Sequence, residues 1–147
     1  MSHEVHIYTD GAAKGNPGPA GYGVVMEMVG TPYKKEFYEG FRLSTNNRME
    51  LMAAIEGLKA LVRASKVMLF TDSKYVQQGI TLWIVNWRKK GWLRPNSDKI
   101  KNVDLWLELE ELNAKHNVTW QWIRGHSGHK ENEIVDEAAR NAINKNN

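Results

Sequence analysis

The sequence predicts an α/β fold, in which a mixed five-stranded sheet is flanked by helices. Three strand-like segments separated by short Gly- and Pro-rich turns come first, which favours an antiparallel meander. Two more strand-like segments follow, separated by helical stretches, which favours parallel crossover connections. A chain of 147 residues suits one hydrophobic core, so we expect residues 1–147 to form a single domain.

The three N-terminal strands are expected at residues 4–9, 21–29 and 33–41, joined by the turn segments GNPGPAG and GTP. Gly and Pro at this density indicate tight connections. Asp10 follows the first strand at once, and Gly11 comes next. The carboxylate of Asp10 is therefore expected at the end of a strand, beside a loop with little side-chain bulk.

The central part places one buried strand among helices. A helix is expected at residues 47–62, where the spacing of a core-facing stripe is shown by Leu51, Ile55, Leu58 and Val62. The apolar run 67–71 is typical of a strand buried on both faces. A short helix then begins in DSKYVQQG and is expected to stop at Gly79, and a helix at residues 83–90 is expected to stop at Gly91.

The C-terminal part adds the last strand and two helices. A helix is expected at residues 103–114, and residues 118–123 are rich in strand-forming types. The segment GHSGHKEN is interpreted as a loop, and a final helix is expected at residues 131–144. The inner side of that helix is predicted to carry Val135, Ala138, Ala139, Ala142 and Ile143.

Composition excludes several classes of protein. The chain is 41% hydrophobic and 25% charged, as in ordinary soluble proteins. It has no apolar run long enough to span a bilayer and no basic segment leading into an apolar one, so neither membrane association nor a secretory signal is expected. The absence of cysteine excludes disulfides, thiol nucleophiles and thiolate zinc sites, and it fits a reducing compartment. We therefore expect a cytoplasmic protein.

Positive charge is concentrated in one segment. The formal net charge is +3, which permits a polyanionic partner without requiring one. Residues 83–101 carry six basic side chains against one acid, together with three tryptophans. Trp83 and Trp87 lie four residues apart and share a helix face, so we expect them to pack together rather than stack on bases. The neighbouring bases are expected to contact phosphates without reading sequence.

Four acids from four separate elements are candidates for a metal site. Asp10 and Asp72 each follow a strand, and if those strands are parallel neighbours both carboxylates emerge at the same sheet edge. Glu50 lies early on a helix whose small residues permit close approach to the sheet, and Asp136 lies near the start of the final helix. Like charges held together repel, so a shared divalent cation is a reason to keep them. With oxygen ligands alone, Mg²⁺ or Mn²⁺ is favoured.

Each acid also has a plain structural alternative. Asp10 with Gly11 is a common turn pair, and Asp72 is able to cap the helix that follows it. Asn47 with Glu50 matches a helix-capping pair. Asp136 is four residues before Arg140, a spacing that permits an ion pair on a solvated helix face.

Two other motifs carry weaker signals. His126 and His129 are able to form a two-histidine metal pair, but with no cysteine nearby the pattern favours solvated loop histidines. The glycines after Asp10 do not form a phosphate-binding P-loop, because no Gly-Lys-Ser/Thr follows them.

Taken together, six segments resemble the type 1 ribonuclease H family in order and spacing. They are YTDGAAKGNPGPAGYG, STNNRMELMAAIEGL, FTDSKYVQQGI, WIVNWRKKGW, KNVDLW and RGHSGHKENEIVDEAAR. The resemblance covers residues 5–143 and is to the stand-alone bacterial form, without an additional N-terminal hybrid-binding domain. Six segments in register outweigh the alternatives that each acid has alone. The resemblance implies a ribonuclease H-like fold.

That resemblance also implies an activity and its residues. The family cleaves the RNA strand of RNA–DNA hybrids, leaving 5′-phosphate and 3′-hydroxyl ends, and removes RNA primers and R-loops. By similarity the metal-binding catalytic acids are Asp10, Glu50, Asp72 and Asp136, while His126 assists proton transfer or product release. Two Mg²⁺ ions are expected with substrate bound, with Mn²⁺ as a substitute, one activating water and the other stabilising the leaving 3′-oxygen.

Hybrid contacts are also implied by the resemblance. Thr45 with Asn102 is similar to a pocket for a phosphate of the DNA strand, and WIVNWRKKGWLR to a basic protrusion that holds the hybrid. Lys74, where many relatives carry glutamine, and Val85, where a polar residue is common, depart from the pattern. The complete set of predicted substrate contacts is Asn16, Thr45, Asn46, Gln78, Trp83, Arg88, Lys89, Lys90 and Asn102.

Three competing functions remain distinguishable by experiment. One is a module that binds hybrids without cleaving them, and another is a nuclease of the same fold that acts on a different substrate such as DNA junctions. The third is a metal-independent ribonuclease that uses paired histidines and yields cyclic phosphates. We expect instead a metal-dependent hybrid nuclease that acts as a monomer, with no obligate protein partner.

Overall fold

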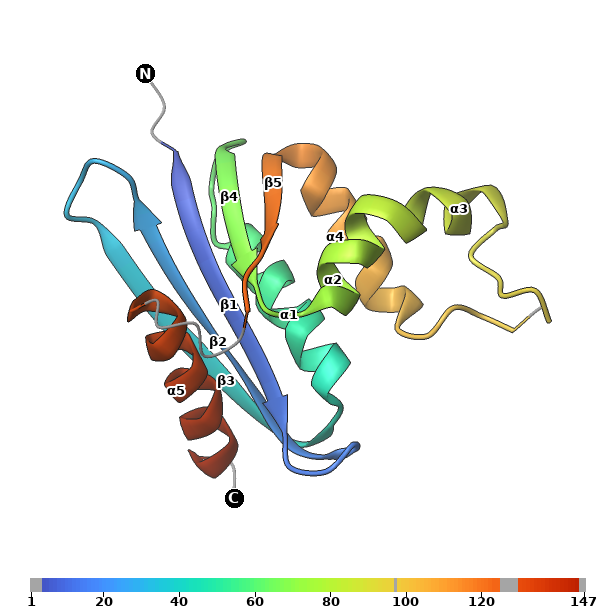
Figure 1. The fold of residues 1–147 in the computed structure, drawn as a ribbon, viewed down its shortest axis with the longest axis horizontal. Coiled ribbons are helices and arrows are strands. Elements are labelled where there is room, and N and C mark those ends of the chain that lie inside the picture. Colours follow the sequence, from blue (N-terminus) through green and yellow to red (C-terminus); the bar gives the residue numbers. More distant parts are fainter. Residues whose placement is uncertain (1–3, 97, 125–129, 146–147) are drawn as a thin grey trace.

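The computed structural model describes residues 4–96, 98–124 and 130–145. Figure 1 shows a twisted sheet with helices on both faces, and its strand order is β3-β2-β1-β4-β5. The strands are β1 (Val5–Ala13), β2 (Gly18–Met28), β3 (Lys34–Ser44), β4 (Lys66–Thr71) and β5 (Asn117–Trp122). The larger helices are α1 (Asn46–Lys59), α4 (Val103–Lys115) and α5 (Lys130–Lys145), and the shorter ones are α2 (Lys74–Gln78) and α3 (Ile84–Lys89).

The pairing of the strands confirms the predicted mixed sheet. β1 pairs antiparallel with β2, and β2 pairs antiparallel with β3. β4 runs parallel to both β1 and β5. The three N-terminal strands thus form the meander, and the helical crossovers deliver the two parallel strands, as the connection lengths predict.

β1 is longer than the sequence predicts, and this changes the position of Asp10. The strand continues through Asp10, which is paired with Gly23, and Gly11, which is paired with Tyr22. The prediction that Asp10 ends the strand and the alternative of an Asp-Gly turn are therefore both wrong. Pairing of β1 with β4, however, stops at Tyr8 opposite Phe70. Asp10 is thus inside a strand on one side but lies beyond the last β4 pair on the other.

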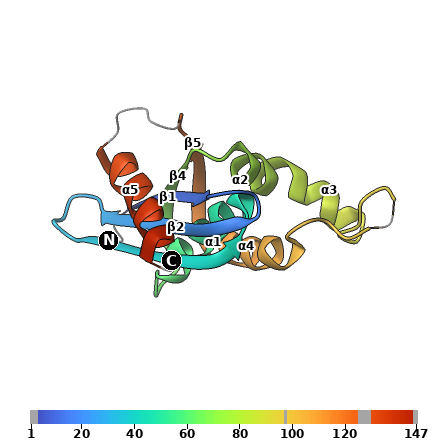
Figure 2. The ribbon, with the colours of Figure 1, turned by 90° about the horizontal axis from the view of Figure 1, so that it is seen from below.

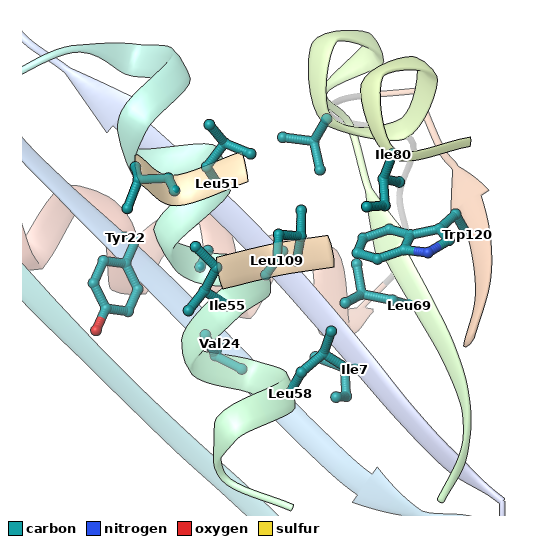
Figure 3. Close-up of a cluster of buried hydrophobic side chains, with 14 of the residues drawn as sticks. Ile7, Tyr22, Val24, Leu51, Ile55, Leu58, Leu69, Ile80, Leu109 and Trp120 are labelled. Atoms are coloured by element: carbon teal, nitrogen blue, oxygen red, sulfur yellow. The ribbon is translucent and has the colours of Figure 1, made fainter. Parts of the chain in front are cut away.

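Alternating residues of the sheet feed two separate cores. On one face Ile7, Val24 and Leu69 pack with Leu51 and Leu58 of α1, a cluster drawn in Figure 3. On the other face Tyr8 and Val25 pack against Val135 of α5. Figures 1 and 2 show α1 and α5 on opposite faces of the sheet, as this alternation requires. The predicted inner side of the final helix is confirmed, because all five of its residues are buried.

Two glycines of β2 allow α5 to lie unusually close to the sheet. A Cβ atom on Gly21 would lie 2.8 Å from the carbonyl oxygen of Ala139, and one on Gly23 would lie 2.8 Å from the Cβ of Ala138. No side chain fits in these gaps. The depth at which α5 sits, and therefore the position of every side chain it carries, depends on these two residues.

The ends of two helices differ from the sequence prediction. α1 ends at Lys59 rather than at residue 62, and Val62, predicted in the core stripe, is 91% exposed. α2 does end at Gln78, directly before Gly79 as predicted, but Gly79 does not end the helical path: it has right-handed helical angles (φ −59°, ψ −50°) and begins a π-helical turn, Gly79–Trp83, that leads into α3. The reason for glycine is the indole of Trp106: a Cβ here would lie 2.1 Å from its Cη2 atom.

The segment 83–101, here called the protrusion, extends away from the sheet with α3 (Figures 1 and 2). α3 ends before Gly91, which has a positive φ of 67°, so the predicted stop at this glycine is confirmed. Within the described residues, none of the helices combines the length and the hydropathy needed to cross a bilayer.

Candidate active site

Three of the four predicted acids come together beside the end of β4. Asp10 lies on β1, Glu50 on α1 and Asp72 directly after β4, and one carboxylate oxygen of each lies within 4.8 Å of the others. Asp10 and Glu50 are only 6% and 4% exposed. The three acids are separated by 40 and 22 positions in the sequence, and the fold brings their acidic groups into one poorly solvated space.

Glu50 reaches this space because the start of α1 lies directly against β1. A Cβ atom on Gly11 would lie 2.5 Å from the backbone nitrogen of Glu50, so only glycine permits the approach. The helix is capped by Thr45, whose hydroxyl accepts a hydrogen bond from the Arg48 N–H at 3.2 Å. The alternative that Asn47 and Glu50 form a capping pair is therefore wrong, and Glu50 makes no contribution to the cap.

Asp72 is positioned by its backbone. Its carbonyl oxygen accepts a hydrogen bond from the indole N–H of Trp122 at 2.9 Å. The cap of α2 is Ser73, whose hydroxyl accepts from the Val76 N–H at 3.1 Å, so the alternative that Asp72 caps this helix is wrong. The carboxylate of Asp72 is thereby left to face the other acids.

Asp136 stands beside Asp10 as a fourth acid. It is half-buried on α5, and a hydrogen bond and charge repulsion from Asp136 both act to raise the pKa of Asp10. Asp136 also forms the ion pair with Arg140 that the sequence spacing permits, with an N–O distance of 3.4 Å. Asp136 therefore both pairs with Arg140 along the helix and lies beside Asp10 in the candidate site.

Crowding and burial strongly disfavour ionisation of the clustered acids. Burial, followed by the charges of Asp72 and Asp136, raises the pKa of Asp10 from 3.8 to about 9, against the opposing hydrogen bond from the Gly11 backbone. Burial, with repulsion from Asp10 and Asp72, raises the pKa of Glu50 well above its usual value. Without a cation, part of this cluster is therefore protonated at neutral pH.

The oxygen atoms of the cluster fit a hard divalent cation. Glu50 Oε1 and Asp72 Oδ1 are buried and have no hydrogen-bond partner within the described part of the chain. Buried carboxylate oxygens without partners are costly, and a bound metal ion satisfies both at once. The donor set contains oxygen alone, which favours Mg²⁺, Mn²⁺ or Ca²⁺ over zinc or copper.

Four of the predicted substrate contacts lie around the start of α1. The side-chain oxygen of Asn16 accepts a hydrogen bond from the Asn46 N–H at 3.1 Å, which joins the first hairpin to the helix. Thr45 and Asn102 are connected through Arg48, whose guanidinium donates to the Asn102 side-chain oxygen at 3.1 Å. Gln78 is the last residue of α2. The predicted pairing of Thr45 with Asn102 is thus geometrically possible, and Arg48 stands between them.

The tryptophans of the protrusion pack together as predicted. The ring centroids of Trp83 and Trp87 are 5.9 Å apart, and that of Trp87 is 5.2 Å from the ring of Trp106. Trp83 nevertheless keeps 36% of its surface exposed. This cluster of tilted indole rings attaches the protrusion to the body of the protein through Trp106, which is completely buried.

The cations of the protrusion are exposed but differ in their partners. Arg88 forms an ion pair with Glu110 of α4. Lys89 and Lys90 are exposed, and neither forms an ion pair with the described residues. The positive charges of these two lysines are therefore available to a polyanion, whereas the charge of Arg88 is partly compensated.

Comparison with known proteins identifies the family. A model of the RNase H family matches residues 2–144. The chain belongs to the RNase H family. It is 56% identical to a ribonuclease H of Aeromonas salmonicida (strain A449) over 142 residues, 97% of this chain and 91% of that protein. It is 54% identical to a ribonuclease H of Pseudomonas entomophila (strain L48), over 99% of this chain and 97% of that protein.

A solved structure agrees with the assignment to the RNase H family. LC9-RNase H1, described as a type 1 RNase H with the type 2 active-site motif, superposes with a TM-score of 0.88 at 31% identity, over 100% of this chain and 75% of that one. The family and the fold predicted from the six sequence segments are both confirmed. The roles of the individual side chains remain predictions.

Two residues near the site are not predicted from the sequence, and two predicted residues cannot be compared with the structure. Arg48 was not singled out, although it lies three residues after Thr45 within STNNRMEL, and its side chain also donates to Asp104 at 3.1 and 2.9 Å. Trp122 was read only as a strand former. His126 and His129, for which a catalytic and a metal-binding role were considered, lie outside the described residues.

Proposed function

We propose that this RNase H family member is a metal-dependent endoribonuclease that hydrolyses the RNA strand of RNA–DNA hybrids. The observation that carries the proposal is the cluster of Asp10, Glu50 and Asp72, whose oxygens converge within 4.8 Å in a buried space. Family membership supports the enzyme class, and LC11-RNase H1, which shares the fold with a TM-score of 0.72, has a solved structure in complex with an RNA/DNA hybrid.

The residues that would hold Mg²⁺, or Mn²⁺ in its place, are Asp10, Glu50, Asp72 and Asp136. A pair of such ions supplies an activated water and stabilisation of the charge on the leaving oxygen. The unpartnered oxygens of Glu50 and Asp72 supply ligand positions already aimed into the cluster. Burial of these carboxylates keeps competing water away from the reacting phosphate, which strengthens each electrostatic interaction there.

Binding and chemistry are assigned to different residues of the chain. Thr45, Arg48 and Asn102 form a polar group for a phosphate of the DNA strand, supported by Asn16 and Asn46. Gln78 at the end of α2 and Trp83 at the start of the protrusion are proposed as further contacts with the hybrid. Lys89, Lys90 and Arg88 supply sequence-independent attraction to the backbone. The 2′-hydroxyl then serves recognition of the RNA strand, because water is the nucleophile. His126 is proposed to assist proton transfer or product release.

Cleavage of a uniformly labelled hybrid, with and without chelator, tests the proposal. We expect cleavage only with divalent metal, confined to the RNA strand, with 5′-phosphate and 3′-hydroxyl ends and with little sequence preference. Cyclic phosphate ends, or cleavage in chelator, would point to the metal-independent mechanism. Binding without cleavage would indicate a hybrid-binding module, and preferred cleavage of duplex or branched DNA a different nuclease.

The proposed setting is a single-domain cytoplasmic monomer that removes RNA primers and R-loops without an obligate protein partner. Light scattering of the purified protein tests the monomer. Loss of activity on dilution, at concentrations where substrate still saturates the enzyme, would contradict it.

A further inference from the structure

The end of β5 lies against the backbone that carries Asp72. Trp122 is the last residue of β5 and is paired with Thr71 of β4. Its indole N–H donates to the Asp72 carbonyl at 2.9 Å, and the Ile123 backbone N–H donates to the Thr71 carbonyl at 2.9 Å. Two successive carbonyls at the end of β4 are therefore held from the same neighbouring strand.

This support matters because the Asp72 side chain is only partly held by hydrogen bonds. Its Oδ1 atom is buried without a hydrogen-bond partner in the described structure, so the position of that oxygen depends largely on the backbone. The residue also lies between two elements, after the last residue of β4 and before the first of α2. A carboxylate at such a junction is placed only as accurately as its main chain.

The outer face of the indole is covered by Lys74. Its Nζ atom lies 4.8 Å from the centre of the Trp122 ring, a cation–π distance, while the Lys74 side chain remains exposed to solvent. The half-buried indole is thus held on its edge by the Asp72 carbonyl and on its face by a lysine from the first turn of α2. Both contacts come from the three-residue stretch 72–74, which begins with Asp72 itself.

We propose that Trp122 is a positioning residue for Asp72: its indole N–H fixes the Asp72 carbonyl and thereby sets the carboxylate for divalent-cation binding, with Lys74 holding the indole in place. The inference rests on the proposed function, because it takes Asp72 to be a metal ligand. Hydrogen bonds that orient ligand residues from behind typically change metal affinity or activity 10- to 100-fold when removed.

The experiment compares Trp122→Phe with Trp120→Phe. Trp120 lies on the same strand, and its indole N–H donates to the Asn113 side chain at 2.8 Å, away from the acids. Each variant loses one indole hydrogen bond, but only one of these bonds supports Asp72. Mn²⁺ binding to the free protein, followed by the electron paramagnetic resonance signal of unbound Mn²⁺, gives a readout that does not depend on activity.

We expect Trp122→Phe to raise the Mn²⁺ dissociation constant by about tenfold or more, and to lower kcat with little change in KM for the hybrid. Trp120→Phe should remain within about twofold of the wild type in both measurements. Lys74→Met, which keeps an unbranched apolar stem, should weaken Mn²⁺ binding by about two- to fivefold. An unchanged constant for Lys74→Met would remove the lysine from the proposal.

The outcomes separate this inference from the function on which it rests. If the wild type binds no Mn²⁺, or Asp10→Asn binds as tightly as the wild type, the proposed function fails. If those controls behave as expected but Trp122→Phe and Trp120→Phe are equal, only the role of Trp122 fails. Should Trp122→Phe not fold, replacement of the indole by the isosteric benzothiophene removes the N–H alone, and the same comparison decides.

Discussion

Beside the end of β4 three acidic side chains lie together, two of them buried and one half-buried, whereas in the protrusion six cations stand exposed to solvent. In the first region the side chains are fixed by close backbone approaches, such as that of Gly11 to α1. In the second the tryptophans are packed, but among the described residues Arg88 is the only one of the neighbouring cations that forms an ion pair, with Glu110.

The contrast separates two tasks of one enzyme. Charges that are removed from water interact strongly with one another, and their burial opposes folding. They are therefore expected at an active site, where the chemistry requires side chains at fixed positions. Exposed charges are screened by salt and contribute little to stability, but they attract a polyanion from a distance. Changes in the first region should therefore alter catalysis and stability, and changes in the second should alter affinity and its salt dependence.

The largest expected effect is on cleavage by Asp10→Asn. Loss of this buried carboxylate, which we propose as a metal ligand, should lower kcat by on the order of 1,000-fold, equivalent to about 4 kcal/mol in the activation free energy. The hybrid affinity of the variant should stay within about threefold of that of the wild type, because the protrusion and the proposed phosphate-binding residues around Thr45 are unchanged. Single-turnover cleavage and fluorescence anisotropy measure the two quantities, and a parallel fall in affinity would break the separation of tasks.

The next largest effect is expected where Gly79 packs against Trp106, at the connection between the protrusion and the rest of the protein. Gly79→Ala places a methyl group 2.1 Å from Trp106 Cη2 and should lower the free energy of unfolding by about 1–3 kcal/mol, even though alanine favours helices. Urea denaturation measures this change. In a double-mutant cycle, Trp106→Phe should relieve part of the cost, and strict additivity of the two changes would show that the crowding is not the cause.

A smaller effect is the pH dependence of the metal-free protein. Because the pKa of Asp10 is raised from 3.8 to about 9 on folding, its contribution to stability is fully present below about pH 4 and is lost as pH rises toward 9. The acidic groups that face Asp10 are Glu50, Asp72 and Asp136, and the charges of Asp72 and Asp136 both raise the pKa of Asp10. In chelator, Asp10→Asn should therefore melt roughly 5 °C higher than the wild type at pH 8.

The advantage of Asp10→Asn should shrink on acidification and on addition of Mg²⁺ to the wild type, because a bound cation favours the ionised acids. Differential scanning calorimetry from pH 4 to pH 9 follows both trends. A constant difference across that range would show that the Asp10 carboxyl does not titrate within it.

The smallest effect is expected for single cations of the protrusion. Lys89→Ala should reduce the slope of log affinity against log salt by about one and weaken hybrid binding several-fold at low salt. Arg88→Ala should have a weaker effect, because Glu110 partly compensates its charge. Lys66→Ala, at the opposite end of β4 from Asp72, is the control. Equal slopes for all three variants would place the phosphate contacts elsewhere.

Much of this arrangement is visible in the sequence because it depends on local patterns. Turn residues and period-two runs predict the meander, and helices between the last strands predict the parallel pairs. The convergence of Asp10 with Asp72 follows from adjacent parallel strands. The position of Asp10 inside a strand does not, because it arises where β1 continues past the end of its pairing with β4.

Two of the failures share one cause, which is a partner far away in the chain. A glycine after a short helical segment is typical of a helix end, but glycine is required at position 79 because the indole of Trp106, 27 residues later, leaves no room for a Cβ atom. Arg48 joins the proposed phosphate-binding residues only through its hydrogen bond to Asn102, 54 residues away. Val62 fits the helical period, but periodicity carries no information on where α1 ends.

The two glycines of β2 that seat α5 also tie the acid cluster to the docking of that helix. Asp136 comes beside Asp10 because α5 lies close against β2, where Gly21 and Gly23 leave no room for a Cβ atom. A larger residue at either position would push α5 outward and carry Asp136 away from Asp10. Two positions without a side chain therefore set the spacing of two acids that lie on different elements.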